Sequence, residues 1–334
     1  MSAPLVEIAG LTVDFEKDGR SSRAVEGGGL PVAPGEALGI VGESGSGKSV
    51  TWLAALGLLP ARARVQGSVR IDKQQLIGAA PKLLESVRGK PIAMIFQDPS
   101  SCLNPVHRTG CQPVEALSLH RALDGAAAEA AALRLLDQVG IADAKRRLGD
   151  YPHQLSGGLN QRVMVAMGLA GEAVLLGADG AAAAGGGTIQ PQILALLGSI
   201  RRDTGMALVL ISHDLGVVAE NVNRVAVMYA GRLVEEAMGQ DLFGAARHPY
   251  TQGLLAALPT LSGPRRRLAA IPGTVPEPGK APPGCSSAPR CPLAEPRCQN
   301  EPPPVRRVGL MHRAACHLQI DVGFSAWNLA KAAE

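Results

Sequence analysis

The segment Gly42–Ser49, with the sequence GESGSGKS, constrains this chain more than any other feature. It lies between a short apolar run, Ala37–Val41, which is typical of a buried strand, and the helix-compatible stretch Val50–Leu59, which ends at Pro60. Glycines let successive backbone N–H groups turn inward around phosphate oxygens, and the start of the following helix adds partial positive charge. The sequence therefore predicts a loop that binds the phosphates of a nucleotide.

Two side chains at the end of this loop have distinct predicted roles. Lys48 would neutralise the β- and γ-phosphates, and the hydroxyl of Ser49 would bind Mg²⁺. The rest of the loop, which would offer its backbone to the phosphates, consists of Gly42, Glu43, Ser44, Gly45, Ser46 and Gly47. ATP and Mg²⁺ are the predicted cofactors, although the loop alone does not choose among kinases, GTPases and transport ATPases.

Short apolar strands alternate with helical stretches along the rest of the chain. The predicted strands are Leu11–Phe15, Ala37–Val41, Ile92–Phe96, Val174–Ala178 and Ala207–Ser212, and later helices are predicted at about 158–170 and 190–204. Between about residues 99 and 154 the chain is rich in Ala, Leu and charged residues at helical spacing, which predicts a helical insertion. The alternation predicts an α/β fold with a parallel, doubly wound sheet.

The composition limits the class of protein. Apolar residues make up 46% of the 334 residues, which predicts a packed globule, and the low aromatic content of 3% leaves Leu, Val, Ile and Ala to build its core. The net charge of +4 comes without a dense basic stripe, so nucleic acid is not an expected partner. Without a signal-peptide pattern or a window near the roughly 20 apolar residues of a membrane span, we expect a cytoplasmic chain that reaches a membrane only through a partner.

A second glycine-rich turn, Leu155-Ser156-Gly157-Gly158, opens a predicted helix far downstream of the first. A Ser followed by two Gly residues at a helix start is another place where backbone N–H groups can hold an anion. One chain does not need two cradles for the same γ-phosphate. We therefore expect this turn to serve the nucleotide held by another subunit.

With these features the chain resembles the nucleotide-binding subunits of ABC transporters. LSGG is similar to the family's signature motif, which in a head-to-tail dimer caps the ATP bound to the opposite phosphate loop. The resemblance implies that Gln97, at a strand end, contacts Mg²⁺ or the attacking water and senses the membrane subunit. It also implies that His213, after the strand Ala207–Ser212, is the switch histidine that touches the γ-phosphate.

Four further runs resemble the dipeptide, oligopeptide and nickel group of importer ATPases. They are YPHQLSGG (Tyr151–Gly158), IFQDPSSCLNP (Ile95–Pro105), SHDLGVVAE (Ser212–Glu220) and HPYTQGLL (His248–Leu255). The likeness covers about Val6 to Leu318. It implies a nucleotide-binding domain over residues 1–258, with an N-terminal antiparallel β region and a helical subdomain at about 99–154, followed by a Pro- and Cys-rich region over 259–334.

The resemblance also implies partners and a location. The chain would be the energy-coupling subunit of an importer for peptides or similar small solutes, at the cytoplasmic face of the inner membrane. It would pair with itself or with a homologous ATPase subunit and act on two transmembrane permease subunits. A periplasmic or lipid-anchored solute-binding protein would join through the permease. The transported solute is not encoded in this chain.

One segment departs from the family's pattern. Asp179, which would hold Mg²⁺ together with Ser49 and Gln97, directly follows the predicted strand Val174–Ala178. In the family a Glu that polarises the attacking water follows at once, whereas this chain has Gly180. A run of Ala and Gly over 181–187 replaces the next part, so that Gly186 stands where the family has the aspartate of its D-loop.

We expect ATP binding to survive this change and hydrolysis at the chain's own site to suffer, because losing a general base typically costs ~10²–10⁴-fold in rate. The intact Leu155–Gly158 could complete a partner's site. A subunit that binds ATP without hydrolysing it, or an inactive homologue, are the alternatives. Leu159-Asn160 stands where the group has Met-Arg, and Phe15 is the candidate to stack on adenine, although core packing is its expected role.

Four cysteines gather in the Pro-rich region, at Cys285, Cys291, Cys298 and Cys316. Their spacing is not the CxxC pattern of zinc ribbons. It resembles the C-terminal cysteine set of many peptide-importer ATPases, some of which hold an iron–sulfur cluster such as [4Fe-4S] on four thiolates. A zinc site with His312 or His317 and free thiols are the other readings. Cys102 and Cys111 are expected to be ordinary buried or half-buried residues.

Overall fold

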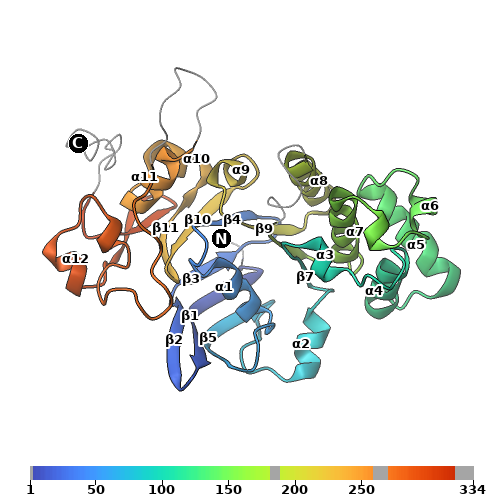
Figure 1. The fold of residues 1–334 in the computed structure, drawn as a ribbon, viewed down its shortest axis with the longest axis horizontal. Helices are drawn as coiled ribbons and strands as arrows, with labels where there is room; N and C mark the ends of the chain where they lie inside the picture. Colours follow the sequence, from blue (N-terminus) through green and yellow to red (C-terminus); the bar gives the residue numbers. More distant parts are fainter. Residues whose placement is uncertain (1–2, 181–188, 259–269, 320–334) are drawn as a thin grey trace, which may run out of the picture. The chain divides into compact units, whose positions relative to one another are not determined.

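The computed structural model describes residues 3–180, 189–258 and 270–319 of the chain. The chain divides into two compact units. The first unit comprises residues 1–4, 32–37 and 78–212, and the second comprises residues 5–31, 38–77 and 213–334. Figure 1 labels the helices and strands of both.

An antiparallel sheet opens the second unit. Its strands are β1 (Val6–Lys17), β2 (Arg20–Glu26), β5 (Ala63–Ile71) and β6 (Gln74–Gln75), in the order β2-β1-β5-β6, and β3 (Gly29–Val32) also pairs with β1. Val6 and Ile8 of β1 are buried, as alternation along a strand requires. The pairing with β5 then shifts between Ala9 and Thr12, which brings Leu11 and Val13 to the core as well.

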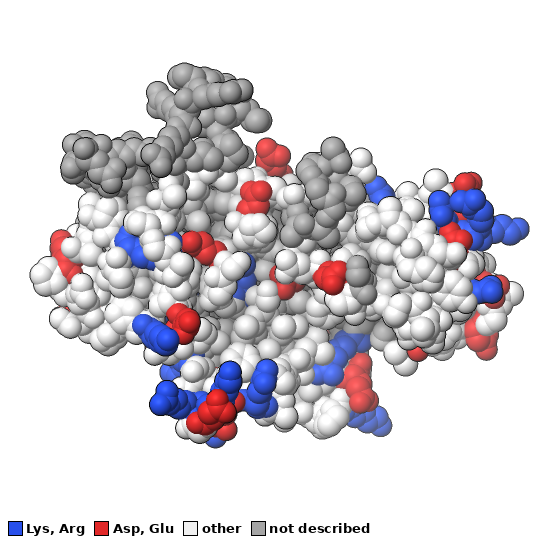
Figure 2. Space-filling model, viewed as in Figure 1, with Lys and Arg blue, Asp and Glu red and all other residues white. Residues whose placement is uncertain are grey.

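Opposite charges lie side by side on the outer surface of this sheet. Arg23 on β2 pairs with Asp14 on β1 at 2.9 Å, and Arg64 on β5 pairs with Glu16 on β1 at 3.0 Å. Figure 2 shows this mixture of blue and red over the β1–β2–β5 region. Such exposed pairs each contribute well under ~1 kcal/mol, so the buried apolar face is what holds the sheet together.

A second sheet in this unit carries the nucleotide loop at one strand end. Its strands are β4 (Ala37–Val41), β10 (Arg224–Tyr229), β11 (Arg232–Met238), β12 (Val305–Gly309) and β13 (His312–Ala315), in the order β12-β13-β11-β10-β4. The β4–β10 pair is parallel, and the other pairs are antiparallel. The helices of this unit are α1 (Lys48–Ala55), α9 (Leu215–Ala219), α10 (Gly239–Ala245), α11 (Pro249–Ala256) and α12 (Pro296–Asn300), with a 3₁₀ turn η2 (Ala288–Arg290).

Parallel strands and a cluster of helices make up the first unit. The strands β7 (Ile92–Ile95), β8 (Leu175–Asp179) and β9 (Ala207–Ser212) run parallel in the order β9-β8-β7. The helical elements are α2 (Pro81–Val87), α3 (Pro99–Cys102), α4 (Cys111–Arg121), α5 (Gly125–Gln138), α6 (Ala144–Arg147), η1 (Pro152–Gln154), α7 (Gly157–Leu169) and α8 (Ile189–Thr204). Leu117, Ala131, Ala132 and Ala170 form a small core where α4, α5 and the end of α7 meet. Figure 1 shows these helices gathered together.

The predicted α/β fold is confirmed, and its sheet is mixed rather than only parallel. Parallel pairs occur as expected at β7–β8–β9 and at β4–β10. The strands β11, β12 and β13 add an antiparallel part that was not predicted from the sequence. Residues 99–154 are mostly helical, and α5 is the longest helix among them. Among the described residues, no helix combines the length and the apolar character needed to cross a bilayer.

Helix α11 begins at an unusual cap. His248 is 1% exposed, and its Nδ1 atom accepts a hydrogen bond from the backbone N–H of Tyr250 at 3.1 Å, so the ring is neutral at this nitrogen. The backbone N–H of His248 donates to Glu235 Oε2 at 3.0 Å. Burial lowers the pKa of His248 to about 4, although the nearby Glu235 acts in the opposite direction.

This cap predicts a specific loss of stability in acid. Between the ordinary histidine pKa of about 6.5 and the folded value of about 4, the unfolded chain takes up a proton that the folded chain excludes. The free energy of unfolding should therefore fall with decreasing pH, by up to about 1.4 kcal/mol per pH unit from this group. Urea unfolding at pH 7, 6 and 5 measures the slope. His248→Asn, which can cap the helix without titrating, should have the shallower slope, and equal slopes would contradict the assignment.

Candidate nucleotide-binding site

The loop between β4 and α1 has the geometry of a phosphate cradle. Gly42 lies at φ +151°, and a Cβ atom there would come within 2.2 Å of the backbone oxygen of Met228, so only glycine fits. Gly47 caps α1 in a left-handed conformation, and α1 carries no acidic residue in its first turn. Ser44 and Gly45 are exposed at the tip of the loop. The loop thus leads into a helix N-terminus that has no competing carboxylate on the helix itself.

Lys48 folds its ammonium group back into the loop. The side chain is 9% exposed, and Nζ donates to the backbone oxygens of Gly42 at 2.8 Å and Glu43 at 2.9 Å. It also lies 3.3 Å from Oγ of the fully buried Ser46. Ser49 follows on the first turn of α1, half-buried. A positive charge therefore sits where the predicted site needs one, and the residues present fit a bound triphosphate.

The second glycine-rich turn forms the N-terminus of α7, as predicted. Ser156 is the cap, and its Oγ atom accepts a long hydrogen bond from the backbone N–H of Leu159 at 3.4 Å. Ser156 and Gly157 are exposed, whereas Leu155 is half-buried and Gly158 is buried. The exposed half of the turn can receive a ligand brought by another subunit.

Asn160, one of the departures from the subfamily pattern, has a structural role. Its side chain is 8% exposed, and Nδ2 donates to the backbone oxygen of Pro152 at 2.9 Å. This bond ties the first turn of α7 to the 3₁₀ turn η1 before it.

Two predicted site residues of the first unit lie in contact. Gln97 is exposed just after β7, and Asp179, half-buried, is the last residue of β8. Gly180 follows at φ +60°, buried, with its N–H donating to the backbone oxygen of Ile211 at 2.9 Å. A Cβ atom on Gly180 would lie 2.5 Å from Cγ of Gln97, so the glutamine packs directly against the glycine. The Ala/Gly run that follows, with Gly186, lies outside the described residues.

The remaining predicted residues occupy loop and strand positions. His213 is exposed in the bend that follows β9 along the chain, directly before Asp214, whose Oδ1 atom caps α9 by accepting from the N–H of Val217 at 3.2 Å. Phe15, in β1, is half-buried and does not belong to the fully buried core. The loop Gly42–Ser49 and His213 belong to the second unit, and Gln97, Leu155–Gly158 and Asp179 belong to the first.

Comparison with known proteins places this site in a family. The ABC transporter family model matches residues 26–183, and the model described as "Oligopeptide/dipeptide transporter, C-terminal region" matches residues 234–298. A putative peptide import ATP-binding protein of Brucella abortus (strain 2308) is 48% identical over 303 residues, which are 90% of this chain and 91% of the relative. The chain belongs to the ATP-binding subunits of the ABC transporter family.

Other relatives and a solved structure agree with this assignment. The dipeptide transport ATP-binding protein DppD of Escherichia coli (strain K12) is 43% identical over 318 residues, covering 95% of this chain and 97% of the relative. A dimeric ATP-binding cassette, solved in a post-hydrolysis state with ADP and phosphate, superposes with a TM-score of 0.63 at 25% identity. That match covers 70% of this ABC subunit and 98% of the solved chain.

The C-terminal cysteines of this ABC subunit are neighbours, but they do not form a metal site as placed. Burial raises the pKa of the Cys291 thiol to about 12, and the nearby Cys285, Cys316 and Cys298 add to the shift. Cys298 is 8% exposed and the other three are half-buried. Over residues 3–180, 189–258 and 270–319, no three His, Cys, Asp or Glu side chains are grouped so that they could hold a metal ion. The predicted iron–sulfur cluster and the alternative zinc site therefore find no support in this arrangement of the described residues.

The expectation for the other two cysteines was wrong. Cys102, at the end of α3, and Cys111, at the start of α4, are both exposed. Short helices in the insertion turn these positions outward, and the apolar core of that region is built from Ala and Leu instead.

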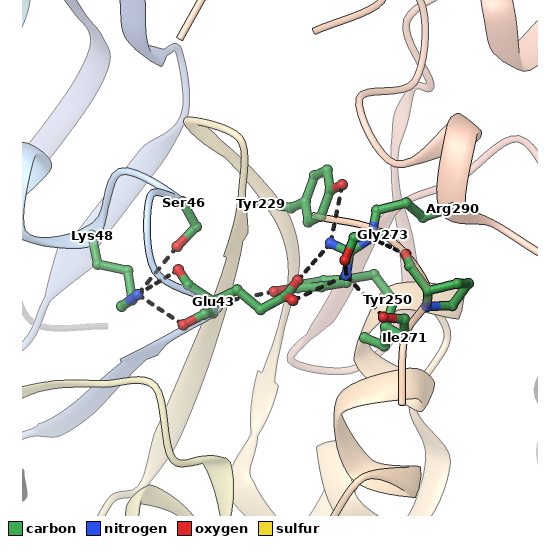
Figure 3. A network of polar contacts seen from close by, with 10 residues as sticks. Glu43, Ser46, Lys48, Tyr229, Tyr250, Ile271, Gly273 and Arg290 are labelled. Atoms are coloured by element: carbon green, nitrogen blue, oxygen red, sulfur yellow. Dashed lines mark hydrogen bonds and ion pairs between the residues drawn. The ribbon is translucent and has the colours of Figure 1, made fainter. Parts of the chain in front are cut away.

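Sequence reasoning missed three residues that surround the phosphate loop. Figure 3 shows Arg290, Tyr229 and Tyr250 around Glu43, the second residue of the loop. Arg290 forms an ion pair with the Glu43 carboxylate at 2.7 Å. No local pattern could have found this pair, because its members are 247 positions apart in the sequence.

The contact between Gly180 and Gln97 predicts that any side chain at position 180 is destabilising. Gly180→Ala would place an L-residue in the left-handed region, which costs about 1–2 kcal/mol, and would push Gln97 out of its place. Chemical denaturation measures the change in the free energy of unfolding. Gly244→Ala is the matched control, because Gly244 is exposed in α10 with open space around its missing Cβ. A Gly180→Ala variant as stable as the control would show that the turn is not restrictive.

Proposed function

We propose that this chain is the ATP-binding, energy-coupling subunit of an importer for peptides or similar small solutes. The observation that carries the proposal is the phosphate loop with its buried Lys48, in a chain whose relatives are named for peptide and dipeptide import. The match of residues 234–298 to an oligopeptide/dipeptide transporter region supports the same substrate class. On this proposal, residues 1–258 form the nucleotide-binding domain, with its helical subdomain at about 99–154, and residues 259–334 form the importer-type C-terminal region.

The residues of the loop have separate tasks in the proposed site. Backbone N–H groups of Gly42–Ser49 bind phosphate oxygens, and Lys48 neutralises their charge. Ser49, Asp179 and Gln97 would hold Mg²⁺, which screens the developing charge on the phosphates when it is bound. His213 would contact the γ-phosphate. In a head-to-tail pair of subunits, Ser156 and Gly157 would cap the triphosphate on the partner's loop with the N–H groups of α7.

Hydrolysis is proposed to be unequal between the two sites of such a pair. Gly180 has no side chain to orient water, so this chain's own loop would hold ATP with little turnover. Its exposed Ser156–Gly157 turn would complete a site on a homologous subunit that carries the missing carboxylate. The rival function is a subunit that only binds ATP and regulates, or one that is inactive.

The wider assembly follows from the same proposal. Two ATPase subunits would act on two transmembrane permease subunits at the cytoplasmic face of the inner membrane, and a solute-binding protein would join through the permease. Closure of the pair on ATP would move the permease through the helical subdomain next to Gln97.

Steady-state ATPase measurements test the unequal pair. The chain alone should bind Mg-ATP but hydrolyse it ~10²-fold or more slowly than an intact homologue. A mixture with that homologue should hydrolyse ATP, and Ser156→Arg in this chain should lower the turnover of the mixture by ~10²-fold, because the cap on the partner's γ-phosphate is lost.

Ser86→Ala provides the control, since Ser86 is an exposed serine of α2 outside the proposed site and should leave the mixture unchanged. Full activity of the isolated chain would contradict the claim about Gly180. A mixture that is indifferent to Ser156→Arg would favour the regulatory or inactive alternative.

A further inference from the structure

The residue that links the phosphate loop to the C-terminal region is Glu43. Each of its polar groups bonds to a different partner. Its backbone N–H donates to Tyr250 Oη at 2.9 Å, and its backbone oxygen accepts from Lys48 Nζ at 2.9 Å. Its carboxylate accepts hydrogen bonds from Nη1 and Nη2 of Arg290, at 2.7 and 3.0 Å. The carboxylate is therefore held at the edge of the loop by a residue of the C-terminal region.

Arg290 is built into its place from several sides. It is the last residue of η2, its side chain is 6% exposed, and its Nε donates to the backbone oxygen of Pro272 at 2.7 Å. Its Nη2 also lies 3.3 Å from the backbone oxygens of Ile271 and Gly273. The guanidinium lies 5.8 Å from the ring centre of Tyr229, which itself packs edge-on against Tyr250. Burial acts to lower the pKa of Arg290, but Glu43 and Tyr229 outweigh it, so the group stays charged.

The direction of the Glu43 side chain matters for a site that binds anions. Figure 3 shows the carboxylate pointing away from Lys48 and toward Arg290. Lys48 is bonded to the backbone oxygen of this same residue, so the carboxylate and the ammonium belong to adjacent parts of the loop. A carboxylate released from Arg290 could turn to Lys48 and compete with the γ-phosphate. Even without turning, its uncompensated charge would repel the phosphates within the ~8–10 Å screening length.

We propose that Arg290 is a positioning residue for ATP binding: it neutralises Glu43 and holds its carboxylate away from Lys48, so that the C-terminal region sets the affinity of the phosphate loop. This inference rests on the proposed function, in which ATP occupies the loop Gly42–Ser49. It gives the C-terminal region a task in the nucleotide cycle that no sequence motif indicated.

The first test measures the affinity of the full chain for Mg-ATP, by calorimetry or by a fluorescent analogue. Arg290→Gln should weaken binding by about tenfold, within the usual range of a coupling between sites. Arg290→Lys retains the charge and should bind within about threefold of the wild type. The loss of affinity in Arg290→Gln should become smaller as the salt concentration is raised, because it arises from an uncompensated negative charge on Glu43.

A second substitution separates charge from mere structure. In the Glu43→Gln/Arg290→Gln double variant the unpaired carboxylate is gone, so binding should return to within about threefold of the wild type. A C-terminal region that had simply lost its packing would not be repaired by removing a charge on the loop. Arg290→Gln binding like the wild type, or a double variant no better than Arg290→Gln, would overturn the proposal.

The loop side offers a test that leaves the C-terminal region untouched, in case Arg290→Gln does not fold. Glu43→Asp retains the charge but draws it back from the guanidinium, so it should bind ATP severalfold more weakly than Glu43→Gln, which has no charge to leave unpaired. Equal affinities for these two variants would contradict the proposal. The matched control is Arg297→Gln, because Arg297 pairs with Glu295 on the exposed surface of the same region, and it should bind as the wild type does.

Failure of the proposed function would look different. Lys48→Ala removes the charge that the phosphates need, and it should abolish binding in every background. A wild-type chain without affinity for Mg-ATP would end the nucleotide assignment itself. Suppose that the wild-type chain binds Mg-ATP, that Lys48→Ala abolishes this binding and that Arg290→Gln does not change it. This result would leave the nucleotide assignment in place and reject only the role of Arg290.

Discussion

The backbone of the phosphate loop depends on a buried cation that its own carbonyl oxygens hold in place. Lys48 is 9% exposed and its Nζ reaches back to the oxygens of Gly42 and Glu43. A buried ammonium without partners is very unfavourable, so the loop must curl around it. Gly42 makes the curl possible because its backbone passes so close to Met228 that no side chain fits. The loop is therefore held in shape by its own groups, and the N–H of Gly231 adds a hydrogen bond of 2.9 Å to the backbone oxygen of Ser46.

The chemistry of this chain lies where strands and helices end. The loop follows β4, Gln97 follows β7, Asp179 ends β8 and Ser156 begins α7. Backbone groups at such ends lack partners within their own element, so they are available to phosphates and metal ions. In each unit the strands and helices fix the positions of these residues. The C-terminal region adds to this arrangement by placing a strand, β13, beside β11 and an arginine beside the loop.

The sequence predicted these element ends well and their surroundings poorly. The strands β4 and β9 match their predicted bounds, because each is an apolar run that stops at a polar or glycine residue. Helix α1 ends at Ala55, earlier than its apolar run suggests, since Leu56 is already its C-cap and Gly57 follows in a left-handed conformation. The antiparallel strands β12 and β13 were not predicted, because the Pro-rich sequence around them hides their alternation. The pairing of β13 with β11 depends on residues far apart in the chain.

Contacts that join distant residues were the least predictable part of the candidate site. The loop motif specified Lys48 and Ser49, but nothing near Glu43 in sequence indicates an arginine 247 positions later. The exposure of Cys102 and Cys111 was missed for a related reason, since cysteine is buried in most proteins and only the packing of α3 and α4 decides otherwise. The clash between a Cβ atom at Gly180 and the side chain of Gln97 could likewise not be predicted, because it is visible only once the ends of β7 and β8 have known positions.

On the proposed function, binding and hydrolysis depend on parts of the chain that tolerate change very differently. Binding uses backbone N–H groups, a helix N-terminus and one buried lysine, so it depends on few side chains besides Lys48 and the Glu43–Arg290 pair. Hydrolysis needs a carboxylate at a single position, and Gly180 lacks it. Gly180 has a left-handed backbone and packs directly against Gln97. Placing a glutamate there would therefore require both residues to move, and a single substitution would not by itself rebuild a hydrolytic site.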